Sequence, residues 1–114
     1  MKLAIIGSRN LYVQNFEDYL PSNVTEIVSG GARGMDTGAA EYAKRKGMRL
    51  TEFYPDYARY GRGAPLRRNV LIAEYSDMVL AFWDGKSKGT LHTLSLFEKL
   101  GKKILIVKLE EISQ

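Results

Sequence analysis

The order in which short apolar runs and helix-like segments follow one another constrains the fold of this chain more than any other feature. Runs of apolar residues, of the length of a buried strand, alternate with segments whose apolar residues recur at helical spacing. The five predicted strands are residues 3–6, 25–28, 48–54, 77–83 and 104–107. The predicted helices are residues 13–20, residues 35–46, a helix that begins at Pro65, and residues 90–100.

Proline and apolar spacing define the helices further. Pro21 cannot extend the first helix, and Pro65 suits a first helical position because its missing N–H has no partner to lose there. The apolar faces predicted for the third and fourth helices consist of Leu66, Val70 and Ala73, and of Leu91, Leu94 and Phe97.

Five alternations of strand and helix predict an α/β fold with a parallel sheet, because each right-handed crossover carries a helix back across the sheet. The simplest strand order is 3-2-1-4-5, a Rossmann-like three-layer sandwich. The third run alternates apolar with polar residues, as expected at a half-solvated edge, and residues 78–82 form the most apolar run, as expected at the centre. The chain has 45% hydrophobic residues and no linker or repeat, so we expect one domain over residues 1–114.

This strand order predicts where a ligand would bind. The chain reverses direction between the first and fourth strands, and doubly wound sheets bind their ligands in the crevice at that point. The loops that follow strands one, two and four are rich in glycine and meet at the same edge of the sheet. We therefore expect the functional site at this edge.

The loop after the second strand predicts an anion site. Glycines between a strand and a helix let the backbone approach a phosphate while the N–H groups of the helix point at it. The same glycines are also explained by a tight strand-to-helix turn. Arg33 adds a charge-assisted donor, and Asp36 either caps the helix or accepts a ribose hydroxyl. The candidate ligand-binding residues here are Ser29, Gly30, Gly31, Arg33, Gly34 and Asp36.

Two further loops share the expected edge. After the first strand, Ser8 and Arg9 offer a hydroxyl and a guanidinium, which suits phosphate oxygens. After the fourth strand, a P-loop fails on spacing, because its first glycine would fall on Leu80 inside a strand. What remains is a glycine-flanked turn that opens a helix. The candidates from these loops are Gly7, Ser8, Arg9, Asp84, Gly85, Gly89 and Thr90.

Residues 54–68 mix tyrosines with arginines, and we predict residues 55–64 to form a long loop. Such a mixture stacks bases and neutralises phosphates, but it also occurs in surface loops that tyrosines tie down. The net charge of +4 is a small surplus for a nucleic-acid backbone, so a nucleotide-sized ligand is favoured. Arg68 and Asn69, early in the next helix, are the residues of this segment that we expect at the site.

Candidates for catalysis are few. The single histidine, His92, lies in the first turn of the last helix, where it either faces the ligand or is exposed to solvent. Glu41 and Glu74 are expected to be solvated, and no metal-ligand cluster is discernible. Cysteine is absent and the N-terminus has no long apolar segment. We expect a cytoplasmic protein that does not associate with membranes.

The stretch Ser29-Gly30-Gly31-Ala32-Arg33-Gly34-Met35-Asp36, with Gly7-Ser8-Arg9, Arg68-Asn69 and Gly89-Thr90, resembles the SLOG superfamily of Rossmann-like domains. The likeness is strongest to its small DUF2493 or YspA-like branch of bacterial and phage proteins, related to the LOG and DprA families. The resemblance implies a nucleotide or nucleotide-derived ligand at the glycine loops. Enzymatic members release a base from a nucleoside monophosphate with a glutamate, and Thr93 stands in its place here.

Three hypotheses follow. The first is a sensor domain that binds a nucleotide derivative by its phosphates and performs no catalysis. The second is a nucleoside monophosphate N-glycosidase in which Asp36 or His92 replaces the absent glutamate. The third is a DprA-like binder of single-stranded nucleic acid. A small nucleotide is the expected partner, ahead of nucleic acid; no other cofactor is expected, and apolar helix faces leave a homo-oligomer open.

Overall fold

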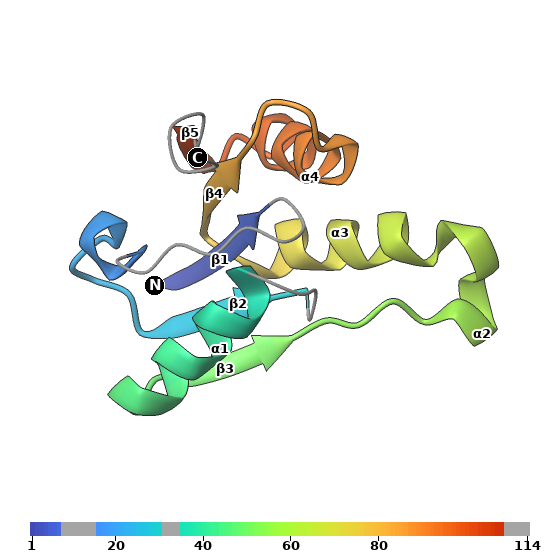
Figure 1. The fold of residues 1–114 in the computed structure, drawn as a ribbon. Helices are drawn as coiled ribbons and strands as arrows, with labels where there is room; N and C mark the ends of the chain where they lie inside the picture. Colours follow the sequence, from blue (N-terminus) through green and yellow to red (C-terminus); the bar gives the residue numbers. More distant parts are fainter. Residues whose placement is uncertain (8–15, 31–34, 109–114) are drawn as a thin grey trace.

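The computed structural model describes residues 1–7, 16–30 and 35–108, and Figure 1 traces their path. The strands are β1 (Lys2–Gly7), β2 (Glu26–Ser29), β3 (Arg49–Glu52), β4 (Met78–Trp83) and β5 (Lys103–Lys108). The helices are α1 (Met35–Lys46), α2 (Tyr57–Tyr60), α3 (Ala64–Tyr75) and α4 (Lys88–Lys99), with 3-10 turns η1 (Phe16–Tyr19) and η2 (Gly61–Gly63).

The five strands form one parallel sheet in the order β3-β2-β1-β4-β5, which confirms the predicted α/β, Rossmann-like class. Strand β3 lies at one edge, as its alternating pattern predicts, and the apolar β4 lies inside the sheet. Because β1 and β4 are neighbours, the chain reverses direction between them. Figure 1 shows the carboxyl ends of β1 and β4 pointing toward one side of the molecule.

Each central strand is apolar on both faces because helices cover both sides of the sheet. On one face, Leu3 and Ile5 of β1 pack with Ala39 and Ala43 of α1. On the other face, Ala4 and Ile6 pack with residues of α3 and α4. Within the described residues, no helix has the length and apolar content needed to cross a membrane.

The structure corrects two predicted helix faces. Leu66 of α3 and Leu91 of α4 are each 52% exposed, although both were expected to face inward. The inward face of α3 uses Ile72, Ala73 and the polar Asn69 instead. The error has a physical cause: Leu66 and Leu91 lie in the first turns of α3 and α4, and an apolar spacing pattern does not show where along a helix the core ends.

Two further expectations are corrected. Residues 55–64, predicted as loop, contain α2 and η2, because the Asp56 side chain caps α2 by accepting a hydrogen bond from the Arg59 backbone N–H (3.2 Å). The predicted helix over 13–20 is a 3-10 turn in its described part, Phe16–Tyr19. Helix α4 begins at Lys88 rather than at residue 90, because the Ser87 side chain caps it.

Candidate functional site

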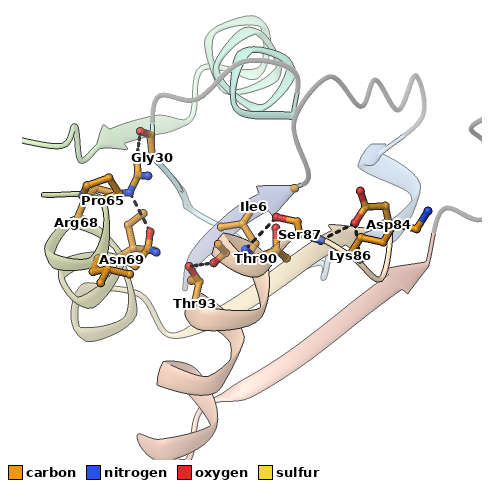
Figure 2. A pocket seen from close by; sticks show the side chains of 14 residues that line it. Ile6, Gly30, Pro65, Arg68, Asn69, Asp84, Lys86, Ser87, Thr90 and Thr93 are labelled. Atoms are coloured by element: carbon orange, nitrogen blue, oxygen red, sulfur yellow. Dashed lines mark hydrogen bonds between the residues drawn. The ribbon is translucent and has the colours of Figure 1, made fainter. Parts of the chain in front are cut away.

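A pocket of about 570 Å³ opens where β1, β2 and β4 end, at the edge that the strand order predicts. The lining comes from the end of β1, from Gly30 directly after β2, from α3 between Pro65 and Ile72, and from the segment after β4 with the start of α4 (Figure 2). The volume lies within the range of small-molecule sites. The residues that line it are Ile6, Gly7, Gly30, Pro65, Leu66, Arg68, Asn69, Ile72, Asp84, Lys86, Ser87, Gly89, Thr90 and Thr93.

The side chain of Arg68 crosses from α3 to the end of β2. Its Nη1 donates a hydrogen bond to the backbone carbonyl of Gly30 (2.6 Å), and its Nε donates to Oδ1 of Asn69 (2.9 Å). A Cβ at position 30 would lie only 2.8 Å from Nη1, so this approach requires glycine. Figure 2 shows the guanidinium held between Gly30 and Asn69 at the pocket wall. Arg68 is therefore a positive charge with a fixed orientation.

Asn69 links Arg68 to α4. It is 7% exposed, and its Nδ2 lies 3.2 Å from Nδ1 of His92. Because its Oδ1 already accepts from Arg68, its amide donates, and Nδ1 of His92 accepts. His92 is thus half-buried rather than exposed to solvent, and it bonds to a residue of the pocket wall without being among the residues that line the pocket.

The segment from Asp84 to the start of α4 is fixed by its own side chains. Oδ1 of Asp84 accepts from the backbone N–H groups of Lys86 (2.8 Å) and Ser87 (2.9 Å). Oγ of Ser87 accepts from Thr90 N–H (3.3 Å), and the Ser87 carbonyl accepts from Leu91 N–H. Among the described residues, no acceptor bonds to the N–H groups of Lys88 or Gly89, so the first turn of α4 retains donors for an anion.

Thr93 lies in the pocket wall, where the resemblance placed a catalytic glutamate in other members. It is 3% exposed, and its Oγ1 donates to the carbonyl of Gly89 (3.1 Å). Threonine has a hydroxyl in place of the carboxylate, so position 93 does not supply a carboxylate to the pocket. Of the described residues that line the pocket, Asp84 carries the carboxylate. Within the same described ranges, no three His, Cys, Asp or Glu side chains gather in a geometry suited to a metal ion.

The structure brings seven of the predicted site residues together. Those that line the pocket are Gly7, Gly30, Arg68, Asn69, Asp84, Gly89 and Thr90. Two others have backbone or core roles: Gly85 has a φ of +82°, which explains its glycine as a turn residue, and Ser29 is fully buried in β2. Ser8, Arg9, Gly31, Arg33 and Gly34, and the side chain of Asp36, lie outside what the structure describes.

Sequence reasoning did not assign several residues of the pocket wall. Ile6, Pro65, Leu66 and Ile72 give it an apolar part, whereas Lys86 adds a second cation. Ile6 and Leu66 were assigned to the core, because an apolar spacing pattern does not separate a pocket wall from a packed face. A signal for Ser87 was present: serine before a helix is a preferred N-cap, and such a helix start presents N–H donors.

Comparison with known proteins gives one informative match. No family model matches the chain, and no solved structure matches it. The Gene 61 protein of Mycobacterium phage D29 is 33% identical over 85 residues, which span 69% of this chain and 68% of that protein. The chain therefore belongs to the same family as the phage Gene 61 protein.

Proposed function

We propose that the pocket binds the phosphate group of a nucleotide or a nucleotide-derived small molecule. The observation that carries this proposal is Arg68, whose guanidinium is held at the pocket wall by Gly30 and Asn69. A guanidinium with a fixed orientation suits phosphate because its planar set of donors matches two phosphate oxygens. The strand order supports the proposal independently, because doubly wound sheets bind nucleotides at this edge.

The remaining wall suits the rest of such a ligand. The phosphate would lie between Arg68 and the N-terminus of α4, where the N–H groups of Lys88 and Gly89 add donors and the helix dipole favours negative charge. Pro65, Leu66 and Ile72 would contact a base or sugar face. The exposure of Leu66, unexplained by the core, is consistent with such a contact.

Binding without turnover is the form of the proposal that the wall supports best. Thr93 carries a neutral hydroxyl that donates to Gly89, so it neither accepts a proton as a carboxylate would nor stabilises an oxocarbenium charge. We propose a sensor or binding domain on this basis. Incubation of the protein at high concentration with nucleoside monophosphates should release no free base, and base release would favour the N-glycosidase alternative instead.

Trp83 provides the readout for a ligand screen. It is the single tryptophan of the chain, and its indole Nε1 donates to the carbonyl of Ser87 (3.1 Å), which lies in the pocket wall. We expect its emission to change saturably with one or more of the four nucleoside monophosphates, ADP-ribose or NAD. The matching unphosphorylated nucleosides, titrated in parallel, should bind at least about tenfold more weakly. Equal affinity for nucleotide and nucleoside would count against a phosphate site.

A further inference from the structure

A second surface of the molecule is rich in exposed aromatic and basic side chains. We call residues 53–67, which run from the end of β3 through α2 and η2 to the first turn of α3, the arm. Figure 1 shows α2 at the tip of the arm, away from the sheet. Neither α2 nor η2 has a buried residue. Residues 57–63 of the arm therefore add nothing to the core, and their composition needs another explanation.

The tyrosines of the arm are exposed to an extent that core packing does not explain. Tyr54, Tyr57 and Tyr60 are 62%, 61% and 41% exposed. An aromatic ring that tied the arm to the body of the protein would bury most of its surface, so the exposure of Tyr57 favours the other sequence interpretation, a ring that accepts a ligand. None of the three tyrosines lines the pocket. Arg59, Arg62 and Arg67 do not line it either, so the aromatic and basic side chains of the arm form a surface separate from the proposed phosphate site, although Pro65 and Leu66 at the end of the arm line the pocket.

The arm also concentrates positive charge. Its three arginines and one aspartate give it a formal charge of +2, half of the +4 of the whole chain. All three arginines are exposed. The guanidiniums of Arg59 and Arg67 lie 5.6 and 5.8 Å from the ring centroid of Tyr60, so ring and cations share one surface.

The arm holds this arrangement through its backbone. Asp56 caps α2, and Gly61 has a φ of +54°, a conformation that glycine adopts readily and that joins α2 to η2. Tyr57 and Tyr60 are three residues apart on α2, which places them on neighbouring positions of one helical face. The backbone therefore holds the rings and guanidiniums close together before a ligand binds, so binding costs little further ordering of the arm.

We propose that the arm binds single-stranded nucleic acid, with bases stacked on Tyr57 and on the exposed part of Tyr60, and with phosphates paired with Arg59, Arg62 and Arg67. Exposed ring faces favour a single strand over a duplex, because only unpaired bases offer their faces for stacking. A second copy of the chain is disfavoured, because two arms that met symmetrically would bring arginines against arginines.

The charge part of the proposal is tested by fluorescence anisotropy with a labelled oligothymidylate of roughly 12 nucleotides, over a series of salt concentrations. Replacing Arg59, Arg62 and Arg67 by Gln should weaken binding at least about tenfold and lower the slope of log affinity against log salt by about 2. The matched control replaces Lys44, Arg45 and Lys46, the exposed cations in the last turn of α1, by Gln. It removes the same charge and should leave most of the affinity intact.

The stacking part is tested at Tyr57. Tyr57→Phe keeps the ring and should retain affinity within about twofold, whereas Tyr57→Leu keeps apolar area without a π face and should lose at least about fivefold. Thermal unfolding checks each variant, and because α2 buries no residue the midpoints should agree with that of the unaltered protein. Competition with AMP separates the arm from the pocket, since AMP at saturation should not release the strand.

Four results would overturn the proposal. The first is the absence of strand binding at low salt. The second is an equal loss of affinity in the arm and α1 triple variants, which would reduce the effect to net charge. The third is release of the strand by AMP, which would place the strand in the pocket. The fourth is preference for a duplex of the same length.

Discussion

Gly30 and Arg68 approach each other so closely that the residue type at one position sets the placement of the other. In the Gly30→Ala variant the new methyl group would lie 2.8 Å from Nη1 and 3.3 Å from Cζ of Arg68. The clashing atoms belong to the end of a flexible side chain, so the guanidinium should move and the fold should remain. We expect affinity for the nucleotide ligand to fall at least about fivefold, with the unfolding midpoint nearly unchanged, in Trp83 titration and thermal unfolding.

Gly63→Ala is the matched control for this prediction. A Cβ at Gly63 meets nothing within 4 Å, and Gly63 has an ordinary φ of −80°. The control should bind the ligand as the unaltered protein does. If the Gly30→Ala and Gly63→Ala variants bind the nucleotide ligand equally well, the position of Arg68 does not affect binding, and the role proposed for Arg68 in the site is wrong.

For single residues, the sequence predicted which charged and glycine residues lie at the pocket better than it predicted their contacts. Arg68 and Asn69 were expected at the site from their place early in the third helix, and both line the pocket. The bond from Arg68 to the Gly30 carbonyl joins residues 38 positions apart, and no local pattern predicts such a pair. Leu66 was assigned to the core because apolar spacing carries no information on where the core ends.

Between elements, Glu26 joins β2, β3 and α3 at the opposite end of the strands from the pocket. Its Oε2 accepts hydrogen bonds from Thr51 Oγ1 (2.7 Å) and from the Tyr75 hydroxyl. Burial raises the pKa of the Glu26 carboxyl, but these hydrogen bonds and the charges of Arg49 and Lys2 outweigh burial and hold the pKa below its ordinary value. The ionised carboxylate therefore stabilises the folded state.

The lowered pKa of Glu26 predicts a pH dependence of stability. A carboxyl whose pKa is lower in the folded state stabilises the protein above the unfolded pKa of about 4.3, and this contribution disappears as the pH falls through the folded value. Glu26→Gln should lower the free energy of unfolding by about 1–2 kcal/mol at neutral pH, and the difference should shrink in acid. Urea unfolding at several pH values measures it. Glu41→Gln, at an exposed site on α1, should show no such difference.

Lys102 caps the C-terminal end of α3 from a different element. Its Nζ donates to the carbonyls of Ala73 (2.7 Å), Glu74 (3.0 Å) and Ser76 (2.7 Å), which matches its three N–H donors to three acceptors at the helix end. Lys102→Met keeps the length of the side chain and removes the donors. We expect a loss of about 1–2 kcal/mol in the free energy of unfolding. Lys103→Met, at the exposed neighbour, should cost far less, and equal losses would refute the capping role.

Strands and long helices were predictable as elements, because periodicity and terminating glycines mark them. Helix α1 matches its predicted bounds, and β4 lies within its predicted run. The short elements were not predictable. Helix α2 has four residues and is capped by Asp56, so only a short stretch of sequence encodes it. Because α2 has no buried face, its sequence shows no apolar periodicity from which a helix could be predicted.

For the whole molecule, the strand order and the location of the pocket followed from the alternation of strands and helices. Right-handed crossovers and short connections leave few arrangements for five parallel strands, and the observed order is the simplest of them. That order then places the loops after β1, β2 and β4 at one edge. The shape and charge of the pocket were not predictable, because they depend on side chains from four elements that meet only in the folded chain.

For the whole molecule, the proposed function depends on phosphate binding in the pocket through Arg68. The most direct test compares Arg68→Gln with Arg67→Gln, which removes the same charge from an adjacent exposed position. Isothermal titration with the tightest ligand of the nucleotide panel should show at least about a tenfold loss of affinity for Arg68→Gln and less than about a twofold loss for Arg67→Gln. Equal affinities in the two variants, or no binding by the unaltered protein, would contradict phosphate binding through Arg68.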